Sequence, residues 1–255
     1  MRPNPVKRKL RRGEQSIGTF VFEFNTTGIA RIVAEAGAEF VIFDMEHTGF
    51  SIDTIRMLLA TCGAADVVPF VRVPAPQYHL LAGVMEMGAM GVMVPWVESA
   101  DTAREIVAAV KYPPHGRRGT AFGVAHDNYT AGDIVEKMKG CNEEGLVIVQ
   151  IETATGLEHV DEIAAVDGVD VLWVGQTDLS TSLGIPGQFD HPKFRAALKT
   201  VVDSATRHGK VAGYMALSVD EGKELQQLGF RCFSYFGDSY IYAQALRAGI
   251  KALRE

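Results

Sequence analysis

Cysteine is scarce in this chain, and long apolar stretches are missing. The 255 residues contain three cysteines, Cys62, Cys141 and Cys232, which are odd in number and far apart. They form no CxxC pair and indicate no disulfide framework, so we expect a reducing compartment, the cytoplasm. No apolar run is long enough to span a membrane, and the N-terminus lacks the apolar centre that a signal peptide requires.

An excess of positive charge is also lacking. The sequence has 25 Lys and Arg against 31 Asp and Glu, which gives a formal net charge of -6. This balance argues against nucleic acid or an anionic membrane as the main partner. The first twelve residues are an exception, and we interpret them as a solvated amphipathic helix rather than a targeting or nucleic-acid-binding arm. Their basic residues are Arg2, Lys7, Arg8, Lys9, Arg11 and Arg12.

What the chain does contain is a regular alternation of β-rich runs and helical patterns. Several runs are continuously apolar, which is typical of parallel strands buried on both faces. The predicted strands are 19–24, 40–43, 67–71, 91–94, 146–151, 169–174, 211–215 and 232–236. The clearest predicted helices are 51–61, 100–110 and 219–228.

Eight strand–helix units in about 250 residues are typical of a (β/α)8 barrel, also called a TIM barrel. An open, doubly wound sheet is the main alternative, but no GxGxxG turn follows the first predicted strand. No linker or change of composition divides the chain, so we predict a single domain over residues 1–255. The longest irregular segment, 111–129, is a long loop of the kind that is often functional.

Polar residues gather where several predicted strands end, which is where the active sites of such barrels lie. They follow or complete the strands at 40–43, 67–71, 146–151 and 169–174, as a single site requires. These residues are Asp44, Glu46, His47, Arg72, Gln150, Glu152, Gln176, Thr177 and Asp178.

Glu152 and Asp178 lie at the ends of adjacent predicted strands, where two carboxylates repel unless a cation lies between them. A hard divalent ion such as Mg²⁺ or Mn²⁺ fits, because it is typically held by one or two carboxylates together with substrate and water. In the alternative, each carboxylate forms a salt bridge or caps the following helix, for which "TDLS" is a suitable start. The spacing alone leaves both interpretations open.

Arg72 is the only cation at a predicted strand end. It can bind a carboxylate or an enolate oxygen, or it can form a structural ion pair. His47, oriented by Asp44, can act as a general base near neutral pH, or it can be a hydrogen-bonded histidine without a catalytic role. No lysine is placed to form a Schiff base, so chemistry at a carbon–carbon bond next to a carbonyl would require a metal to hold the enolate.

Several segments resemble the HpcH/HpaI aldolase family when they are taken together and in order. They are "FDMEH", "VRVP", "MEMGAMGVMVPWVESADTARE", "KYPPHGRRG", "VQIET" and "DLSTSLGIPGQFDHP". The resemblance runs from about Gly18 to the C-terminus. Each motif alone is weak, but their combination is specific.

The resemblance implies a class II aldolase that reversibly cleaves a 2-keto-4-hydroxy acid to pyruvate, or a close analogue, and an aldehyde through a metal-bound enolate. Family substrates include 4-hydroxy-2-oxoheptane-1,7-dioate and 2-keto-3-deoxy sugar acids. The implied cofactor is Mg²⁺, Mn²⁺ or Co²⁺, with no organic cofactor. The alternatives are a CoA-ester lyase like the citrate lyase β-subunit and an oxaloacetate decarboxylase. Few basic residues are available to hold the phosphates of CoA; Arg117 and Arg118 in the long loop are the candidates.

The resemblance also assigns roles to residues. Glu152 and Asp178 match the metal ligands, and Arg72 matches the arginine that holds the pyruvate oxygens. His47 and Asp44 match the dyad that moves the proton, and Glu46 is expected beside the metal site.

Other matches concern the substrate and the assembly. Gln150 matches a glutamine beside the metal carboxylate, and Glu86 an acid that reaches a neighbouring subunit's site. Gln176 replaces the proline usual in the family, in a turn with Thr177 and Asp178 whose N–H groups are expected to hold the substrate carboxylate. The family forms hexamers built from trimers, so we expect a homo-oligomer with the last helix, 240–253, packed on a neighbour.

Overall fold

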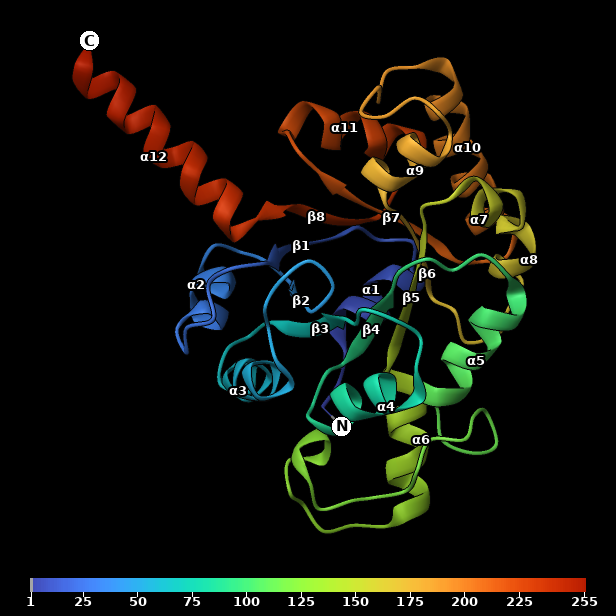
Figure 1. Cartoon of the computed structure of the whole chain (residues 1–255). Helices are drawn as coiled ribbons and strands as arrows, with labels where there is room; N and C mark the ends of the chain where they lie inside the picture. The colour runs from blue at the N-terminus through green and yellow to red at the C-terminus, as the bar shows by residue number, and fades with distance from the viewer. Residues whose placement is uncertain (1) are drawn as a thin grey trace.

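Eight parallel strands, hydrogen-bonded in sequence order, close into a barrel in the computed structural model, which describes residues 2–255 (Figure 1). The strands are β1 Ser16–Val21, β2 Phe40–Asp44, β3 Val68–Arg72, β4 Gly91–Val94, β5 Leu146–Ile151, β6 Val171–Val174, β7 Val211–Ala216 and β8 Cys232–Gly237. The predicted (β/α)8 barrel is therefore confirmed. Its continuous apolar runs are strands buried on both faces, as in β2, β3, β4, β5 and β6.

Helices surround the barrel and follow the strands (Figure 1). Ser51, Ser99 and Ser218 each accept a backbone N–H at the start of α3, α5 and α11, which explains why these helices begin where the sequence predicts. The helices are α1 Pro5–Arg11, α2 Ile29–Glu35, α3 Ile52–Cys62, α4 Tyr78–Glu86, α5 Ala100–Val110, α6 Ile134–Glu144, α7 Ala154–Glu158, α8 Val160–Ala164, α9 Gln176–Ser182, α10 Pro192–Arg207, α11 Val219–Leu228 and α12 Asp238–Arg254, with a 3-10 turn at Ala125–Asp127.

Alternation along the strands divides the core into two layers. In β2, Phe40 and Ile42 belong to the cluster that fills the barrel, whereas Val41 and Phe43 pack with the surrounding helices. Asp44 is two residues beyond Ile42, so its side chain continues the inward row at the carboxyl end of the strand. The interior cluster includes Phe20, Phe40, Ile42, Phe70, Met93, Ile148 and Trp173.

The first strand lies three residues earlier than the sequence predicts. Residues 22–24 suggest a strand because phenylalanines flank a glutamate, but their backbone N–H groups donate to the carboxylate of Asp238. The strand includes Gly18 instead, which pairs with Phe40 of β2. A Cβ at Gly18 would lie 2.3 Å from the Phe40 carbonyl oxygen, so only glycine allows this close approach.

The basic N-terminal segment forms a helix, as predicted, but this helix is not solvated all round. Val6 and Leu10 of α1 are buried in the cluster that fills the barrel, so α1 covers the amino-terminal end of the barrel. Lys7 is also buried, at 3% exposure. The free thiols of the three cysteines are buried as well.

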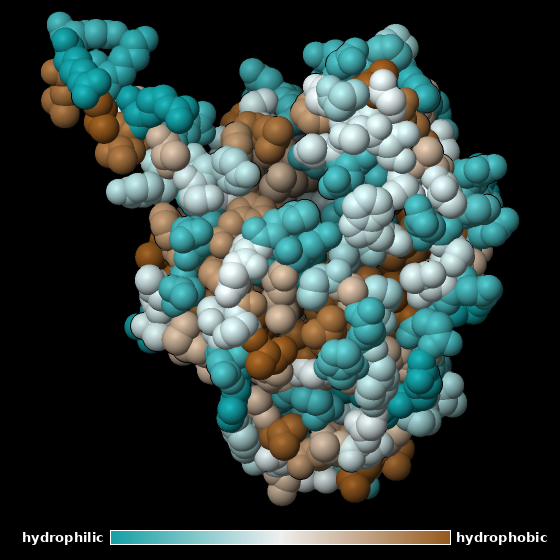
Figure 2. All heavy atoms as spheres, viewed as in Figure 1, coloured by the Kyte–Doolittle hydropathy of each residue, from teal (hydrophilic) through white to brown (hydrophobic). Residues whose placement is uncertain are grey.

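The last helix, α12, projects away from the barrel (Figure 1). Only its first residues approach β1 and β8, and every residue from Tyr240 onward is exposed. Apolar side chains lie along one side of it (Figure 2), at a spacing that puts Tyr242, Leu246, Ile250 and Leu253 on one face. Among residues 2–255, no helix is both long and apolar enough to cross a membrane.

Candidate active site

A cavity of about 730 Å³ opens at the carboxyl ends of the strands. Its lining comes from the ends of β1, β3, β5 and β6, from the loop after β2, and from the first turns of α9 and α12. Most of the predicted site residues meet in this cavity. They are His47, Arg72, Gln150, Glu152, Gln176, Thr177 and Asp178.

Asp44 is fully buried and fixes Arg72 rather than the imidazole of His47. Its Oδ1 accepts hydrogen bonds from Arg72 Nε at 2.6 Å and from the backbone N–H of Glu46 at 3.1 Å, and its Oδ2 accepts the N–H of His47 at 3.0 Å. The register of the barrel makes this contact possible, because Asp44 and Arg72 are paired across β2 and β3. Asp44 was predicted to orient the His47 ring, but in the structure it accepts a hydrogen bond from the His47 backbone N–H instead.

The neighbour of the imidazole is Glu46. Its Oε2 lies 3.6 Å from His47 Nε2 and 3.2 Å from Arg72 Nη1, yet this buried oxygen has no aligned hydrogen-bond partner. Burial raises the pKa of Glu46, and the charge of Arg72 opposes that rise. Glu46 thus links the arginine to a histidine whose side chain is 60% exposed at the cavity.

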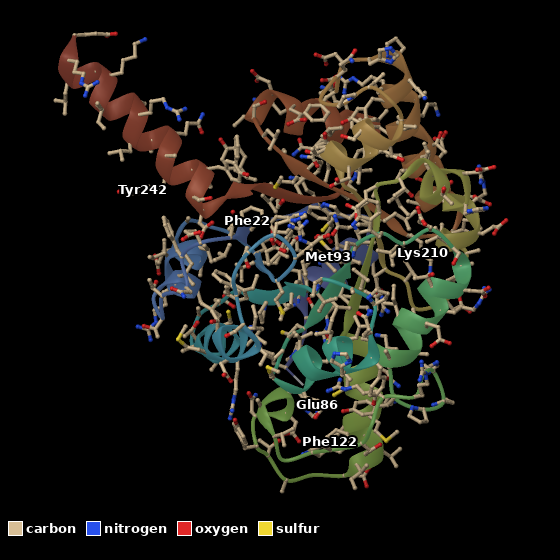
Figure 3. The ribbon with its side chains drawn as sticks, in the orientation of Figure 1. Phe22, Glu86, Met93, Phe122, Lys210 and Tyr242 are labelled. Carbon is tan, nitrogen blue, oxygen red and sulfur yellow. The ribbon has the colours of Figure 1, made fainter. Side chains whose placement is uncertain are left out.

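Two stacked phenylalanines pack against the guanidinium of Arg72. The rings of Phe20 and Phe22 are parallel with centroids 5.1 Å apart, and the guanidinium of Arg72 lies 5.1 Å from the first and 6.0 Å from the second. Phe22 lies at the mouth of the barrel (Figure 3). Asp44 therefore holds the edge of the Arg72 guanidinium, and the two aromatic rings pack near it. These contacts fix the orientation of the guanidinium at the cavity.

Glu152 has both oxygens engaged at the end of β5. Oε1 accepts the backbone N–H of Trp96 at 2.7 Å, and Oε2 accepts Gln150 Nε2 at 3.0 Å. Gly175 leaves the space that this carboxylate occupies, because a Cβ at residue 175 would lie 2.2 Å from Oε2. The amide oxygen of Gln150 is buried without a hydrogen-bond partner.

Negative charge accumulates around Glu152. Burial raises its pKa to about 7; the Trp96 N–H opposes that rise, while the charges of Glu46 and Asp178 add to it. With Asp44, four carboxylates surround one arginine here, an arrangement whose repulsion a divalent cation would relieve.

The donor set therefore fits a hard divalent ion. Glu152 and Asp178 supply carboxylate oxygens, and the unpartnered oxygens of Glu46 and Gln150 lie in the same region. Among residues 2–255, no three His, Cys, Asp or Glu side chains converge as a complete metal site. Such a partial set is typical of Mg²⁺, which usually takes one or two protein carboxylates and completes its shell with water and substrate.

The turn after β6 lies at one side of this carboxylate group. α9 begins at Gln176, directly after Gly175, and Thr177 and Asp178 follow in its first turn. Gln176 is buried, and its side-chain amide donates to the carbonyl of Met215 at 3.1 Å. This hydrogen bond ties the start of α9 to the end of β7, a contact that proline at this position could not make.

Glu86 does not join the cavity of its own chain (Figure 3). It ends α4 and accepts hydrogen bonds from Arg118 Nε at 3.0 Å and Nη2 at 2.8 Å. Arg118 is buried and stacks over Tyr112 at 4.6 Å. The ion pair fastens the long loop to α4, and the predicted role of Glu86 in a neighbouring subunit's site stays a prediction.

Asp238 was not among the predicted site residues, yet it supports the site. This carboxylate accepts the backbone N–H groups of Phe22, Glu23 and Phe24 and of Ser239, at 2.6–3.0 Å. It thereby fixes the loop after β1, and with it Phe22 beneath Arg72. The signal was present: Asp238 directly follows the last strand, so the rule that identified the other strand-end residues also applies to it.

Comparison with known proteins gives a consistent result. A sequence model of the HpcH/HpaI aldolase/citrate lyase family matches residues 17–236. The chain is 32% identical over 243 residues to the 2-keto-3-deoxy-L-rhamnonate aldolase of Escherichia coli O157:H7, covering 95% of this chain and 90% of that protein.

Solved structures agree. An HpcH/HpaI aldolase from Desulfitobacterium hafniense superposes with a TM-score of 0.94 at 32% identity, covering 98% of this chain and 96% of the other. The citrate synthase SbnG gives a TM-score of 0.87 at 27% identity, covering 98% and 97% of the two chains.

Proposed function

The chain belongs to the HpcH/HpaI aldolase/citrate lyase family, and we propose that it is a divalent-metal-dependent aldolase. Its substrate is a 2-keto-4-hydroxy acid, which it cleaves reversibly to pyruvate, or a close analogue, and an aldehyde. The observation that carries the proposal is that Arg72, Glu152 and Asp178 line one cavity. Among residues 2–255, no lysine lines that cavity, which argues against a Schiff-base aldolase.

Glu152 and Asp178 would hold the cation, with Glu46 and Gln150 close by. The ion, which we expect to be Mg²⁺, Mn²⁺ or Co²⁺, would supply Lewis-acid polarisation of the substrate's keto group. The protein's own contribution is to keep these oxygens in place: Trp96 and Gln150 orient the Glu152 carboxylate by hydrogen bonds.

Arg72 binds the oxygens on which negative charge develops. Its Nε is engaged by Asp44, and Nη1 faces Glu46, so Nη2 is the nitrogen without a protein partner among the described residues. A guanidinium held at its edge and along its face loses little freedom when it binds a carboxylate or an enolate oxygen. Arg72 is therefore a preorganised donor for the negative charge of the pyruvate enolate.

His47 moves the proton. In the cleavage direction it removes the proton of the 4-hydroxyl group, the C3–C4 bond breaks, the aldehyde leaves, and the electron pair remains as the pyruvate enolate held by Arg72. Protonation of C3 then gives pyruvate. Glu46, 3.6 Å from His47 Nε2, stabilises the imidazolium that forms.

A metal-dependence assay tests this proposal. Pyruvate release from a 4-hydroxy-2-oxo acid should stop in EDTA and return with Mg²⁺ or Mn²⁺. The variant Asp178→Asn should bind Mn²⁺ more weakly by calorimetry, whereas Asp190→Asn, whose side chain is fully exposed in the loop after α9, should bind it normally. Activity that persists in EDTA, with an imine trapped by borohydride, would contradict the proposal.

A CoA-ester lyase is the weaker alternative. The two arginines of the long loop that were candidates for the CoA phosphates are engaged elsewhere, Arg118 with Glu86 and Arg117 with Glu105. Decarboxylation of oxaloacetate needs the same enolate stabilisation and can be measured in the same preparation. Turnover of citramalyl-CoA without turnover of any 4-hydroxy-2-oxo acid would favour the alternative.

The same proposal includes a homo-oligomer in which α12 of one subunit packs on another. An apolar groove of about 640 Å³ lies between α2 and the start of α12. Its lining includes Ile17, Phe24, Ile29, Ile32, Val33 and Tyr242. The groove and the exposed apolar face of α12 are complementary in character, which supports an exchange of helices between subunits.

Light scattering on the full chain tests the assembly. The paired substitutions Leu246→Asp and Ile250→Asp should lower the molecular mass from the predicted hexamer, whereas Lys251→Asp alone should not. A monomeric wild-type protein would contradict the assembly without affecting the aldolase proposal.

The buried free thiols support a reducing compartment such as the cytoplasm.

A further inference from the structure

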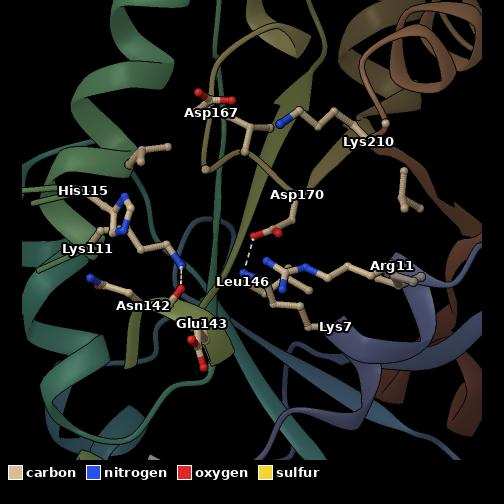
Figure 4. Close-up of a pocket in the computed structure, with 16 residues that line it drawn as sticks. Lys7, Arg11, Lys111, His115, Asn142, Glu143, Leu146, Asp167, Asp170 and Lys210 are labelled. Atoms are coloured by element: carbon tan, nitrogen blue, oxygen red, sulfur yellow. Dashed lines mark hydrogen bonds and ion pairs between the residues drawn. The ribbon is translucent and has the colours of Figure 1, made fainter. Parts of the chain in front are cut away.

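A second cavity, of about 430 Å³, lies at the amino-terminal end of the barrel (Figure 4). Its lining includes residues at the start of β5, β6 and β7, together with α1 and the end of α5. It has no lining residue in common with the candidate active site, which opens at the opposite end of the strands. The proposed reaction uses none of its groups.

Two buried lysines meet inside this cavity and donate to the same oxygen. Lys111, directly after α5, donates to the carbonyl of Gly145 at 2.6 Å and to that of Asn142 at 2.7 Å. Lys7 of α1 also donates to the Gly145 carbonyl, and it pairs with Asp170 at 3.0 Å. A protonated lysine has three N–H groups, and these contacts use two of them on each side chain.

This pair is short of negative charge. Lys7 and Lys111 are 3% and 4% exposed, and Asp170 is the one carboxylate bonded to either of them among the described residues. Burial and, next, the positive charge of Lys7 together lower the pKa of Lys111 to about 7. Buried charges are usually paired with opposite charges. When both lysines are protonated, they share one carboxylate, so one positive charge has no negative partner.

Further positive groups line the cavity. Arg11 is exposed one helical turn after Lys7 and forms no ion pair among residues 2–255. Lys210 extends toward Asp167 (Figure 4), and its ammonium donates to the Val166 carbonyl at 3.1 Å. The two other acidic residues of the lining, Glu143 and Asp167, are exposed. Four cationic side chains thus line the cavity against three carboxylates, whereas the whole chain carries a net charge of -6.

We propose that this cavity is a binding site for a small multivalent anion that carries phosphate or carboxylate groups. The ammonium groups of Lys7 and Lys111 form its floor, and the guanidinium of Arg11 closes over the anion from the rim. The arginine fork suits bidentate contact with phosphate or carboxylate oxygens, and the lysines act as buried point charges. Binding would also fasten α1 to the barrel, because Lys7 and Arg11 belong to α1.

Isothermal titration calorimetry on the full chain, without added divalent metal and at constant ionic strength, tests this site. Inorganic pyrophosphate and citrate serve as probes for the two ligand chemistries. We expect saturable binding of at least one probe, with one site per chain. Arg11→Gln should weaken it about tenfold, the usual value of one charge-assisted contact. Arg12→Gln is the matched control, since it removes the same charge from the adjacent residue, which is outside the cavity lining.

The comparison of variants decides where the anion binds. Binding that survives Arg11→Gln would locate the anion elsewhere, including at Arg72, and would overturn the proposal. Equal weakening by Arg11→Gln and Arg12→Gln would mean that only diffuse surface charge attracts the anion, and this would also overturn the proposal. So would the absence of saturable binding for both probes. Because neither arginine touches the candidate active site, none of these outcomes bears on the aldolase proposal.

Discussion

Replacing Lys111 by methionine should remove a pH-dependent contribution that lowers the free energy of unfolding. Burial, reinforced by the Lys7 ammonium, lowers the pKa of Lys111 from 10.5 to about 7 in the folded state. Between pH 7 and pH 10.5 the unfolded chain therefore binds more protons at this residue than the folded chain does. The contribution of Lys111 to the free energy of unfolding must then rise with pH across this window.

The size of the effect follows from the shift. One pKa unit corresponds to about 1.4 kcal/mol, so the shift from 10.5 to about 7 amounts to roughly 5 kcal/mol at low pH. The wild type should recover roughly 2 kcal/mol of this between pH 7 and pH 9. The hydrogen bonds to Asn142 and Gly145 that methionine cannot make change the offset between the two proteins, but not its slope with pH.

Urea unfolding of the wild type and Lys111→Met at pH 7, 8 and 9 measures this slope. The difference in unfolding free energy should shift toward the wild type by roughly 2 kcal/mol between the ends of the range. Lys199→Met, which removes an exposed lysine on α10, controls for the loss of a lysine as such. A difference between wild type and Lys111→Met that stays constant with pH would refute the reasoning.

Three further predictions concern the candidate site. Asp238→Ala removes the acceptor of four backbone N–H groups and should lower the unfolding free energy by about 2–4 kcal/mol in urea, with Asp238→Asn intermediate. His47→Ala should lower kcat about 10²–10⁴-fold, whereas Glu46→Gln should cost about tenfold; the opposite order in steady-state kinetics would make Glu46 the proton-transfer group. Gly175→Ala displaces the Glu152 carboxylate and should lower kcat about 10²-fold, with some loss of thermal stability because a buried side chain must shift; full activity would mean that this carboxylate is free to move.

The strands of the barrel were predictable because their signal is local. Buried parallel strands are continuously apolar, and the runs that became β2, β4 and β5 agree with the structure to within a residue. The end of the run at 19–24 misled because residues 22–24 resemble a strand, while their backbone N–H groups donate to Asp238, more than two hundred residues away. The residues next to 22–24 in the sequence give no sign of so distant a hydrogen-bond acceptor.

The candidate site was predictable in its composition and less so in its contacts. Polar residues at strand ends converge in any such barrel, so Arg72 and Glu152 were expected at one mouth. That Asp44 holds Arg72 rather than the His47 ring depends on the register between β2 and β3. The position of Glu86 against Arg118 depends on how the long loop folds back on α4.

The sequence by itself determined the eightfold alternation of strands and helices and the set of polar groups at the carboxyl ends, because both are written in short-range patterns of burial and polarity. Tertiary structure alone decided which of these groups touch. It also created the amino-terminal cavity, where Lys7 and Lys111, far apart in the chain, donate to one carbonyl oxygen. The reason is physical: alternation along a strand fixes which way a side chain points, but its partners depend on how the barrel closes and on where α1 covers it.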